Sequence, residues 1–343
     1  MSQFKLVVVA IMVLTCLVGT TWASELGAPA PPLEIREWVK GNSVSLEQGK
    51  GKNIFVVQFW ATWCPYCLVT IPYLEELQKR FADEGVVIVG VTKENPNDVK
   101  QFFEEIGHEM NYVVAADADG KTSDAYLKSF GVDGIPYAFV VDRKSRIIWQ
   151  GHPLDGLDSA LEAIVKGKYD LVEEKRVLTE KKRVEAAKKL LAVYALLARN
   201  TEERDLISSV GDRIYEYARN DADVLDDFAW FIVTDEEVRH RQNELAYKAI
   251  KRAYEVSGGT NSSVAETYAR VLFEMGRTKE AIVYQRKAIL LCQDEEEVAE
   301  LKQTLKRYLE SVSQRLSNRL CFTSPQRDLF SCARIYHLRL SET

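Results

Sequence analysis

The sequence predicts an α/β domain, in which helices flank a central mixed sheet, followed by an all-α domain. Before about residue 170, short runs rich in β-branched residues alternate with amphipathic segments, which is the rhythm of βαβ units. After that point strand signals almost disappear, and Pro325 is the only proline. The 343 residues also exceed one typical core. We therefore expect folded domains at residues 24–169 and 170–312, preceded by a separate segment 1–23 and followed by a poorly structured tail 313–343.

The elements of the first domain follow from apolar runs bounded by turn residues. A proline-rich lead-in at residues 28–32 and a turn cluster at 49–53 come first. The expected strands are 54–60, 86–91, 110–115, 137–141 and 147–150. The expected helices are 65–81, 97–106, 120–130 and 157–166. The continuous apolar run at 86–89 is typical of a strand that helices cover on both faces.

The motif Cys64-Pro65-Tyr66-Cys67 follows the first of these strands and opens the helix over 65–81. A thiolate is the nucleophile of thiol-disulfide exchange, and the free N–H groups at a helix N-terminus lower the pKa of a cysteine. Proline is favoured at the first helical position, so Pro65 places Cys64 at the N-cap, with its sulfur facing the amides of Tyr66 and Cys67. We predict that Cys64 attacks a substrate and that Cys67 resolves the mixed disulfide.

Two other interpretations of this motif are less favoured. A structural zinc site needs two more ligands, but Cys292, Cys321, Cys332 and the four histidines are scattered along the chain. A purely structural disulfide over so short a loop would remove little chain entropy. We therefore expect redox chemistry, with no metal and no cofactor.

The N-terminal segment predicts export. Lys5 precedes an apolar run at residues 6–18, and Thr21-Trp22-Ala23 offers small residues for cleavage before Ser24. The alternative is an uncleaved membrane anchor, because this run approaches the length that spans a bilayer. Cys16 is a poor lipoprotein site, since Thr15 precedes it and apolar sequence follows. We expect a periplasmic or cell-envelope protein with either a cleaved signal or an anchor.

The charge of the chain bears on its partners. The formal net charge of -6 and the pI near 5.5 argue against a nucleic-acid surface, because phosphates would be repelled. Protein partners are favoured instead. Few cysteines remain after residue 23, so stability must come from apolar cores and not from a framework of disulfides.

The residues around the dithiol resemble a known superfamily. The run Trp60-Ala61-Thr62-Trp63-Cys64-Pro65-Tyr66-Cys67, with Pro72 in the helix and Gly134-Ile135-Pro136 before a strand, resembles the thioredoxin superfamily. The lead-in, the insertion around residues 95–128 and the ending Gly151-His152-Pro153 are more similar to the exported TlpA/ResA-like redoxins. The resemblance covers about residues 28–168.

This resemblance implies a thioredoxin-like fold and a set of roles. Pro136 would be a cis-proline packed against the Cys64 sulfur, the alternative being a trans proline at a strand edge. The backbone of Ile135 would pair with a substrate segment, with Trp63 beside it. Trp63, Pro65, Tyr66, Gln58 and Pro136 would support the dithiol. Pro72 would kink the helix.

Two departures from that pattern concern the mechanism. Gln58 stands where many thioredoxins carry a buried acid, and Thr70 stands where ResA-like proteins often have a glutamate. An amide cannot act as a general base, so the Cys67 proton must leave to water, which Gln58 can orient, to an unidentified neighbour or to the substrate thiolate. The Pro-Tyr dipeptide is similar to glutaredoxins, but residues 137–142 lack their paired glycine, so glutathione is not expected.

The second domain is expected to be helical. Residues 181–199 have apolar side chains at helical spacing, with lysines on the other face. Ala246 and Ala253 recur 35 residues later as Ala281 and Ala288, and Trp230 lies 35 before Ala265, which is close to the tetratricopeptide period. The match covers about residues 224–293, with helices at 265–275 and 278–292. This region is either a surface for a protein partner or an appendage that buries only its own core.

Near the C-terminus, Cys321 and Cys332 can pair in an oxidising compartment, and with Cys292 the number is odd, so at least one thiol stays free or intermolecular. The whole chain predicts an exported thiol-disulfide oxidoreductase that acts on protein thiols and disulfides as a reductase supplied by a membrane electron donor. The alternative is an interaction scaffold with a redox-inactive redoxin domain. Only the first function requires exchange through Cys64.

Overall fold

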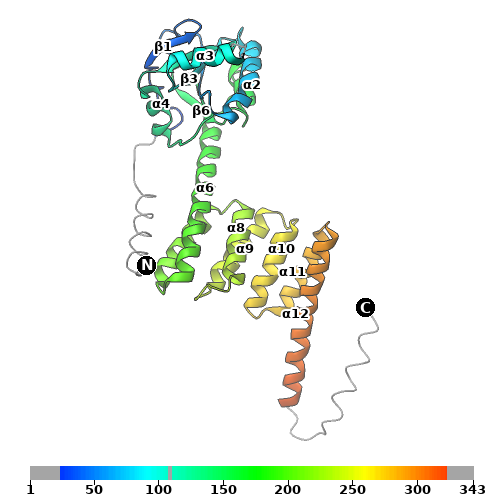
Figure 1. The fold of residues 1–343 in the computed structure, drawn as a ribbon. Helices are drawn as coiled ribbons and strands as arrows, with labels where there is room; N and C mark the ends of the chain where they lie inside the picture. The colour runs from blue at the N-terminus through cyan, green and yellow to red at the C-terminus, as the bar shows by residue number, and fades with distance from the viewer. Residues whose placement is uncertain (1–23, 107–109, 323–343) are drawn as a thin grey trace. The chain divides into compact units, whose positions relative to one another are not determined.

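The computed structural model describes residues 24–106 and 110–322. These residues fall into two compact units, which meet in the sequence between Thr179 and Glu180. The first unit contains a sheet flanked by helices, and the second is helical (Figure 1). Both fold classes agree with the sequence-based prediction. Each unit is described separately below.

A six-stranded mixed sheet forms the centre of the first unit, in the order β1-β4-β3-β2-β5-β6. Its strands are β1 Ile35–Lys40, β2 Ile54–Phe59, β3 Val86–Thr92, β4 Val113–Asp117, β5 Tyr137–Val141 and β6 Ile147–Gly151. Strands β2, β3 and β4 pair in parallel, whereas β1, β5 and β6 each pair antiparallel to their neighbours. The sheet is therefore mixed, as the sequence predicted.

Strand β1 was not among the predicted elements. It lies at the edge of the sheet and pairs with β4 through two register irregularities. None of its six residues is fully buried, so it lacks the continuous apolar run of a central strand. Its pairing depends on β4, which lies more than seventy residues further along the chain.

Helices pack on both faces of this sheet. They are α2 Pro65–Phe81, α3 Pro96–Ile106, α4 Lys121–Tyr126 with the 3₁₀ turn η1 Lys128–Phe130, and α5 Leu157–Val165. Apolar residues of α2, α3 and α5 form one core with alternate positions of β2, such as Val56. The other positions of β2, such as Val57, form a second core with α4 and η1. This alternation follows from the period of two in a strand.

The helix predicted over 120–130 is divided in two. Lys121–Tyr126 is α-helical and Lys128–Phe130 is a 3₁₀ turn, which ends at Gly131 in the left-handed conformation with φ 69°. Tyr126 and Phe130 both place their rings against Phe139 of β5, with centroids 5.3 and 5.1 Å away. Packing on the sheet thus determines the shape of this segment.

Helix α6, Leu171–Asn200, begins in the first unit and continues into the second. The other helices of the second unit are α7 Arg204–Tyr217, α8 Ala222–Thr234, α9 Asn243–Val256, α10 Ser262–Glu274, α11 Thr278–Leu291 and α12 Glu295–Phe322. Helices α8 to α12 follow one another as a row (Figure 1), and α8 contacts both α9 and α10. A core runs from α6 through α11, and Tyr308 of α12 belongs to it.

The alanines that suggested a repeat are all fully buried. Ala246, Ala253, Ala265, Ala281 and Ala288 have no exposed surface, so their small side chains allow neighbouring helices to approach closely. Trp230, which occupies the position equivalent to Ala265, is instead 41% exposed. Its indole lines a cavity together with Glu266, Glu300 and Tyr308. The assignment to tetratricopeptide repeats stays a proposal.

Helix α12 continues to Phe322, so residues 313–322 are helical where the sequence predicted a poorly structured tail. Extending an existing helix costs little, and Arg, Leu and Gln in this stretch are good helix formers. The predicted signal at residues 1–23, Cys16 and Cys332 lie outside the described residues. No helix of the described residues has the length and apolar character needed to cross a membrane.

Candidate active site

Cys64 and Cys67 form a disulfide at the start of α2, with their Cα atoms 5.2 Å apart. Cys64 is the N-cap, in extended backbone conformation, and Pro65 is the first helical residue. The amide of Cys67 donates a hydrogen bond to Cys64 Sγ over 3.2 Å. Cys64 retains 4% of its surface and Cys67 none. The N-cap position and the bond from the Cys67 amide therefore agree with the prediction from Pro65.

The Ile135-Pro136 peptide bond is cis and lies directly before β5. The carbonyl oxygen of Ile135 is 3.9 Å from Cys64 Sγ. A disulfide sulfur carries no hydrogen, so this is a contact, which a reduced Cys64 thiol can convert into a hydrogen bond. Antiparallel pairing of β5 with β2, in which Tyr137 is opposite Phe59, brings the two segments together.

Exposed apolar side chains surround the disulfide. Trp63 is 71% exposed, Tyr66 is 76% exposed, and Val69 on the next turn of α2 is 66% exposed. A small cavity of about 100 Å³ lies beside Trp63, and Ile135 also lines it. Apolar side chains grouped around a reactive pair indicate a surface for another molecule, whereas isolated ones would need no explanation.

Known proteins are similar to the first part of this chain. A family model described as Redoxin matches residues 25–164. The thiol-disulfide oxidoreductase ResA of Bacillus thuringiensis subsp. konkukian is 30% identical over 125 residues, which are 36% of this chain and 68% of ResA. This chain belongs to the ResA-like redoxins of the thioredoxin superfamily. It is an enzyme of the thiol-disulfide oxidoreductase class.

Two further proteins are similar to part of this chain. ResA of Bacillus subtilis is 29% identical over 148 residues, which are 40% of this chain and 78% of that protein. Among solved structures, the thioredoxin domain of a thiol-disulfide oxidoreductase from Bacteroides vulgatus is 29% identical, with a TM-score of 0.36, and the match covers 41% of this chain and 99% of that one.

In this redoxin, Gln58 and Thr70 occupy the two positions where related proteins often carry an acid, and neither of them supplies a base. Gln58 of β2 is 1% exposed; its Nε2 donates to the Phe59 carbonyl over 3.0 Å, and its Oε1 has no partner among the described residues. Thr70 is fully buried and donates its hydroxyl to the Cys67 carbonyl over 2.7 Å. Its hydroxyl is thus used within the helix. The proton of Cys67 has to leave by another route.

Glu94 is a residue of this site that the sequence analysis missed. It follows β3, and its carboxylate accepts hydrogen bonds from the Thr62 amide over 2.7 Å and the Thr62 hydroxyl over 2.6 Å. The Thr92 hydroxyl donates a third bond over 3.0 Å. Glu94 therefore fixes the loop that carries Trp63 and Cys64 to the end of the neighbouring strand.

A signal for Glu94 existed in the sequence. The carboxyl ends of parallel strands meet at one edge of a sheet, and both the Cys64 loop and Glu94 directly follow such strands. An acid at this place is within reach of the loop after β2. The sequence analysis expected the two strands but did not ask which polar residues their ends bring together.

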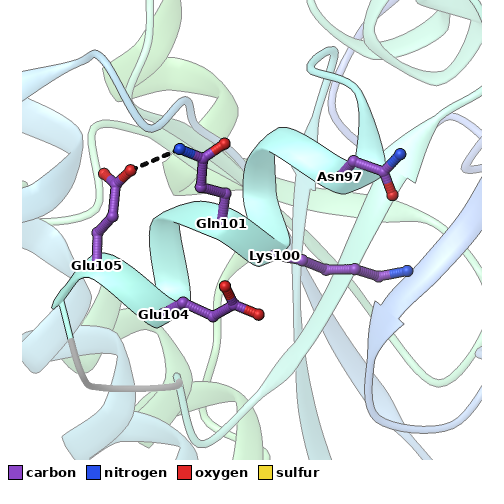
Figure 2. A pocket seen from close by; sticks show the side chains of 5 residues that line it. All are labelled: Asn97, Lys100, Gln101, Glu104 and Glu105. Carbon is purple, nitrogen blue, oxygen red and sulfur yellow. Dashed lines mark hydrogen bonds between the residues drawn. The ribbon is translucent and has the colours of Figure 1, made fainter.

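One hollow of the first unit does not form a site, and the described residues contain no metal cluster. A hollow of about 660 Å³ lies along α3, and the described residues that line it are exposed polar side chains of that helix (Figure 2). The hydrogen bond there, from Gln101 to Glu105, joins successive turns of one helix. Nowhere in residues 24–106 and 110–322 do three His, Cys, Asp or Glu side chains gather closely enough to hold a metal ion.

Proposed function

We propose that this protein is an exported protein thiol-disulfide reductase in which Cys64 is the attacking thiol and Cys67 the resolving one. The observation that carries the proposal is the position of Cys64, at the N-cap of α2 with the Cys67 amide donating to its sulfur. A helix N-terminus stabilises a thiolate more than a thiol, because its N–H groups and dipole favour negative charge. Cys64 therefore has the environment of a nucleophile.

The reaction proceeds by two exchanges. The Cys64 thiolate attacks one sulfur of a substrate disulfide, forms a mixed disulfide and releases the other substrate sulfur as a thiolate. Cys67 then loses its proton and attacks Cys64 Sγ, which forms the Cys64-Cys67 disulfide and releases the second substrate sulfur. The substrate gains two electrons and two protons, one from Cys67 and one from solvent, which had taken the proton of Cys64 when its thiolate formed. The enzyme ends oxidised, so a membrane electron donor has to reduce it again.

Removal of the Cys67 proton is the step for which the described residues offer no evident base. Gln58 and Thr70 cannot accept it, since one is an amide and the other donates its hydroxyl to a backbone carbonyl. The thiolate released from the substrate in the first exchange is a base that forms at the right moment. Water is the second candidate, and the unpartnered Oε1 of Gln58 can orient it.

We further propose that the substrate lies across Trp63 and the Ile135-Pro136 segment. The carbonyl of Ile135 is next to the reactive sulfur and precedes strand β5, so a substrate segment can pair with the backbone as an added strand. Trp63, directly before Cys64 in the sequence, and Tyr66, two residues after it, both have exposed rings. Tetratricopeptide-like helices of the second unit would bind a separate protein partner.

The test is to measure the reduction potential of the Cys64-Cys67 pair on protein beginning at Ser24, equilibrated in defined thiol buffers, with Cys64→Ser as the control. A value near roughly -270 mV supports a reductase, whereas one near roughly -120 mV marks a disulfide donor and overturns the proposed direction. If no reversible couple exists, the proposed chemistry fails and the scaffold function replaces it.

A further inference from the structure

The small cavity of about 100 Å³ in the first unit adjoins the reactive sulfur. Its lining comes from the ends of β2 and β3, from the loop that carries Trp63, from α4 and the following Leu127, and from Ile135 before the cis peptide bond. Trp63 is 71% exposed, and Lys93, directly after β3, is also exposed, so the cavity opens to the surface. The Ile135 carbonyl oxygen is 3.9 Å from Cys64 Sγ, which places the opening beside the site of exchange.

The walls of this cavity are mainly apolar, and its polar side chains have partners within the protein. The Glu94 carboxylate accepts three hydrogen bonds, one of them from the Thr92 hydroxyl. The Ser123 hydroxyl donates to a buried carboxylate of β4 over 2.7 Å, and Lys93 Nζ lies 3.3 Å from a carboxylate of α4. A polar side chain that entered would give up water for apolar walls, whereas an apolar side chain gains by burial.

The volume of the cavity limits the size of its occupant. Sites that enclose whole small molecules usually exceed about 300 Å³, so a cofactor-sized ligand does not fit. A cavity of about 150 Å³ holds a benzene ring. A space of about 100 Å³ therefore suits one aliphatic side chain, such as that of valine or leucine, better than an aromatic ring.

The position of the cavity relative to Cys64 selects one residue of a substrate segment. Cys64 packs in the core on the α2 side of the sheet, whereas Phe59 and Val91 of the cavity lining belong to the core on the α4 side. Successive side chains of an extended segment point to opposite faces. When the cysteine of a segment that pairs with Ile135 reaches Cys64, the residue next to that cysteine points toward the cavity, and the residue two positions away does not.

We propose that this cavity is a subsite for an aliphatic side chain, of the size of valine to leucine, directly next to the reacting cysteine of the substrate protein. The inference rests on the proposed function, because it needs a substrate segment held at Cys64 and Ile135. Burial of the side chain between Trp63 and Leu127 strengthens binding where the two sulfurs meet. Substrates with such a neighbour therefore react faster than substrates without one.

The test measures how fast Cys64 attacks short peptides. The full chain carries Cys67→Ser and is kept in mild detergent, so the reaction stops at the mixed disulfide. Each probe is an end-blocked peptide Gly-Ser-X-Cys-Z-Ser-Gly whose cysteine forms a disulfide with thionitrobenzoate. The Cys64 thiolate bonds to the peptide sulfur and releases thionitrobenzoate, whose absorbance gives the rate.

Two corrections isolate the contribution of the cavity. The rate with a chain that carries both Cys64→Ser and Cys67→Ser is subtracted, because the remaining cysteines also react. Each difference is then divided by the rate of the same peptide with 2-mercaptoethanol, which removes differences in the intrinsic reactivity of the peptides.

Leucine at one of the two positions that flank the cysteine should raise the corrected rate about tenfold over glycine. Phenylalanine or lysine at that position should give a smaller gain or none, and leucine two positions from the cysteine should give none. Leu127→Ala enlarges the cavity, so the preference should move from leucine to phenylalanine, a gain that misfolding cannot produce. Leu33→Ala is the matched control, because Leu33 packs against the same core outside the cavity, and it should keep the preference for leucine.

The outcomes separate this inference from the proposed function. Equal corrected rates for leucine and glycine at both flanking positions would overturn the subsite and leave the reductase chemistry intact. A preference for leucine that Leu127→Ala does not change would place the side chain elsewhere. Discrimination that appears only in a chain ending at Phe322 would make residues 323–343 the occupant. Release of thionitrobenzoate no faster than with Cys64→Ser would refute the proposed function, and the subsite with it.

Discussion

The attachment of the Cys64 loop to Glu94 can be tested by replacing Glu94 with Gln. The two side chains have nearly the same shape, but the amide carries no charge and presents N–H groups where one carboxylate oxygen stood. The carboxylate now accepts bonds of 2.7 and 2.6 Å from the amide and hydroxyl of Thr62. Glutamine can accept from the Thr62 amide through Oε1 and donate from Nε2 to the Thr62 hydroxyl, which then has to accept, so both bonds remain but lose the charge of the carboxylate.

The size of the effect follows from those contacts. Hydrogen bonds to a charged group contribute about 1.5 to 3 kcal/mol each, whereas bonds between neutral groups contribute about 0.5 to 1.5 kcal/mol each. Glu94 is partly exposed, so the lower half of the range applies. We expect Glu94→Gln to lower the free energy of unfolding of the first unit by about 2 kcal/mol. Thr62→Val, which removes only the hydroxyl, should cost about 1 kcal/mol.

The assay combines urea unfolding of the oxidised protein with hydrogen exchange at the Thr62 amide, which reports on this loop alone. A double-mutant cycle of Glu94→Gln with Thr62→Val should give a coupling energy of about 1 kcal/mol, because both changes remove the same contact. Glu105→Gln on the exposed face of α3 is the control and should change little. Additive effects, or an unchanged exchange rate at Thr62, would refute the role given to Glu94.

Three more outcomes are expected. Cys67→Ser should trap substrates as mixed disulfides on Cys64, which mass spectrometry after alkylation detects, whereas a scaffold would trap none. Gly90→Ala places a Cβ 3.1 Å from Trp60 Nε1 and should lower stability by about 1 to 3 kcal/mol, seen as a lower Tm. Burial raises the pKa of Asp226, so the folded protein holds this proton more tightly than the unfolded chain, and stability falls as pH rises above the ordinary carboxyl range near about pH 4. Asp226→Asn should therefore raise the Tm at pH 7, and this gain should vanish below about pH 4, where the aspartate is protonated in both states.

Local signals predicted the elements that carry the dithiol. Helix α2 begins at Pro65 and ends at Phe81, as predicted, because a proline at the first position and a cysteine at the N-cap determine where the helix can start. Strand β2 ends one residue earlier than predicted, at Phe59. The apolar runs of β3 and β5 were similarly informative, since a buried central strand has to be apolar along its length.

Strand β1 and Glu94 show where such reasoning fails. The half-exposed β1 has no apolar run and is a strand because β4 pairs with it. Glu94 belongs to the site because β3 lies beside β2, so that its carboxylate meets Thr62 across 32 residues of sequence. Periodicity reports which face of an element is buried, but it does not report which element becomes its neighbour.

By itself, the sequence determined the chemistry of this protein and its fold classes: two cysteines at a helix N-terminus in an α/β domain, and a helical second domain. Only the tertiary structure decided which distant residues meet. It brings the Ile135 carbonyl to Cys64, 71 residues away, and it encloses Trp230, Glu266 and Tyr308 around one cavity. The physical reason is range: caps and turns act within a few residues, whereas contacts across a sheet or between alternate helices depend on how whole elements pack.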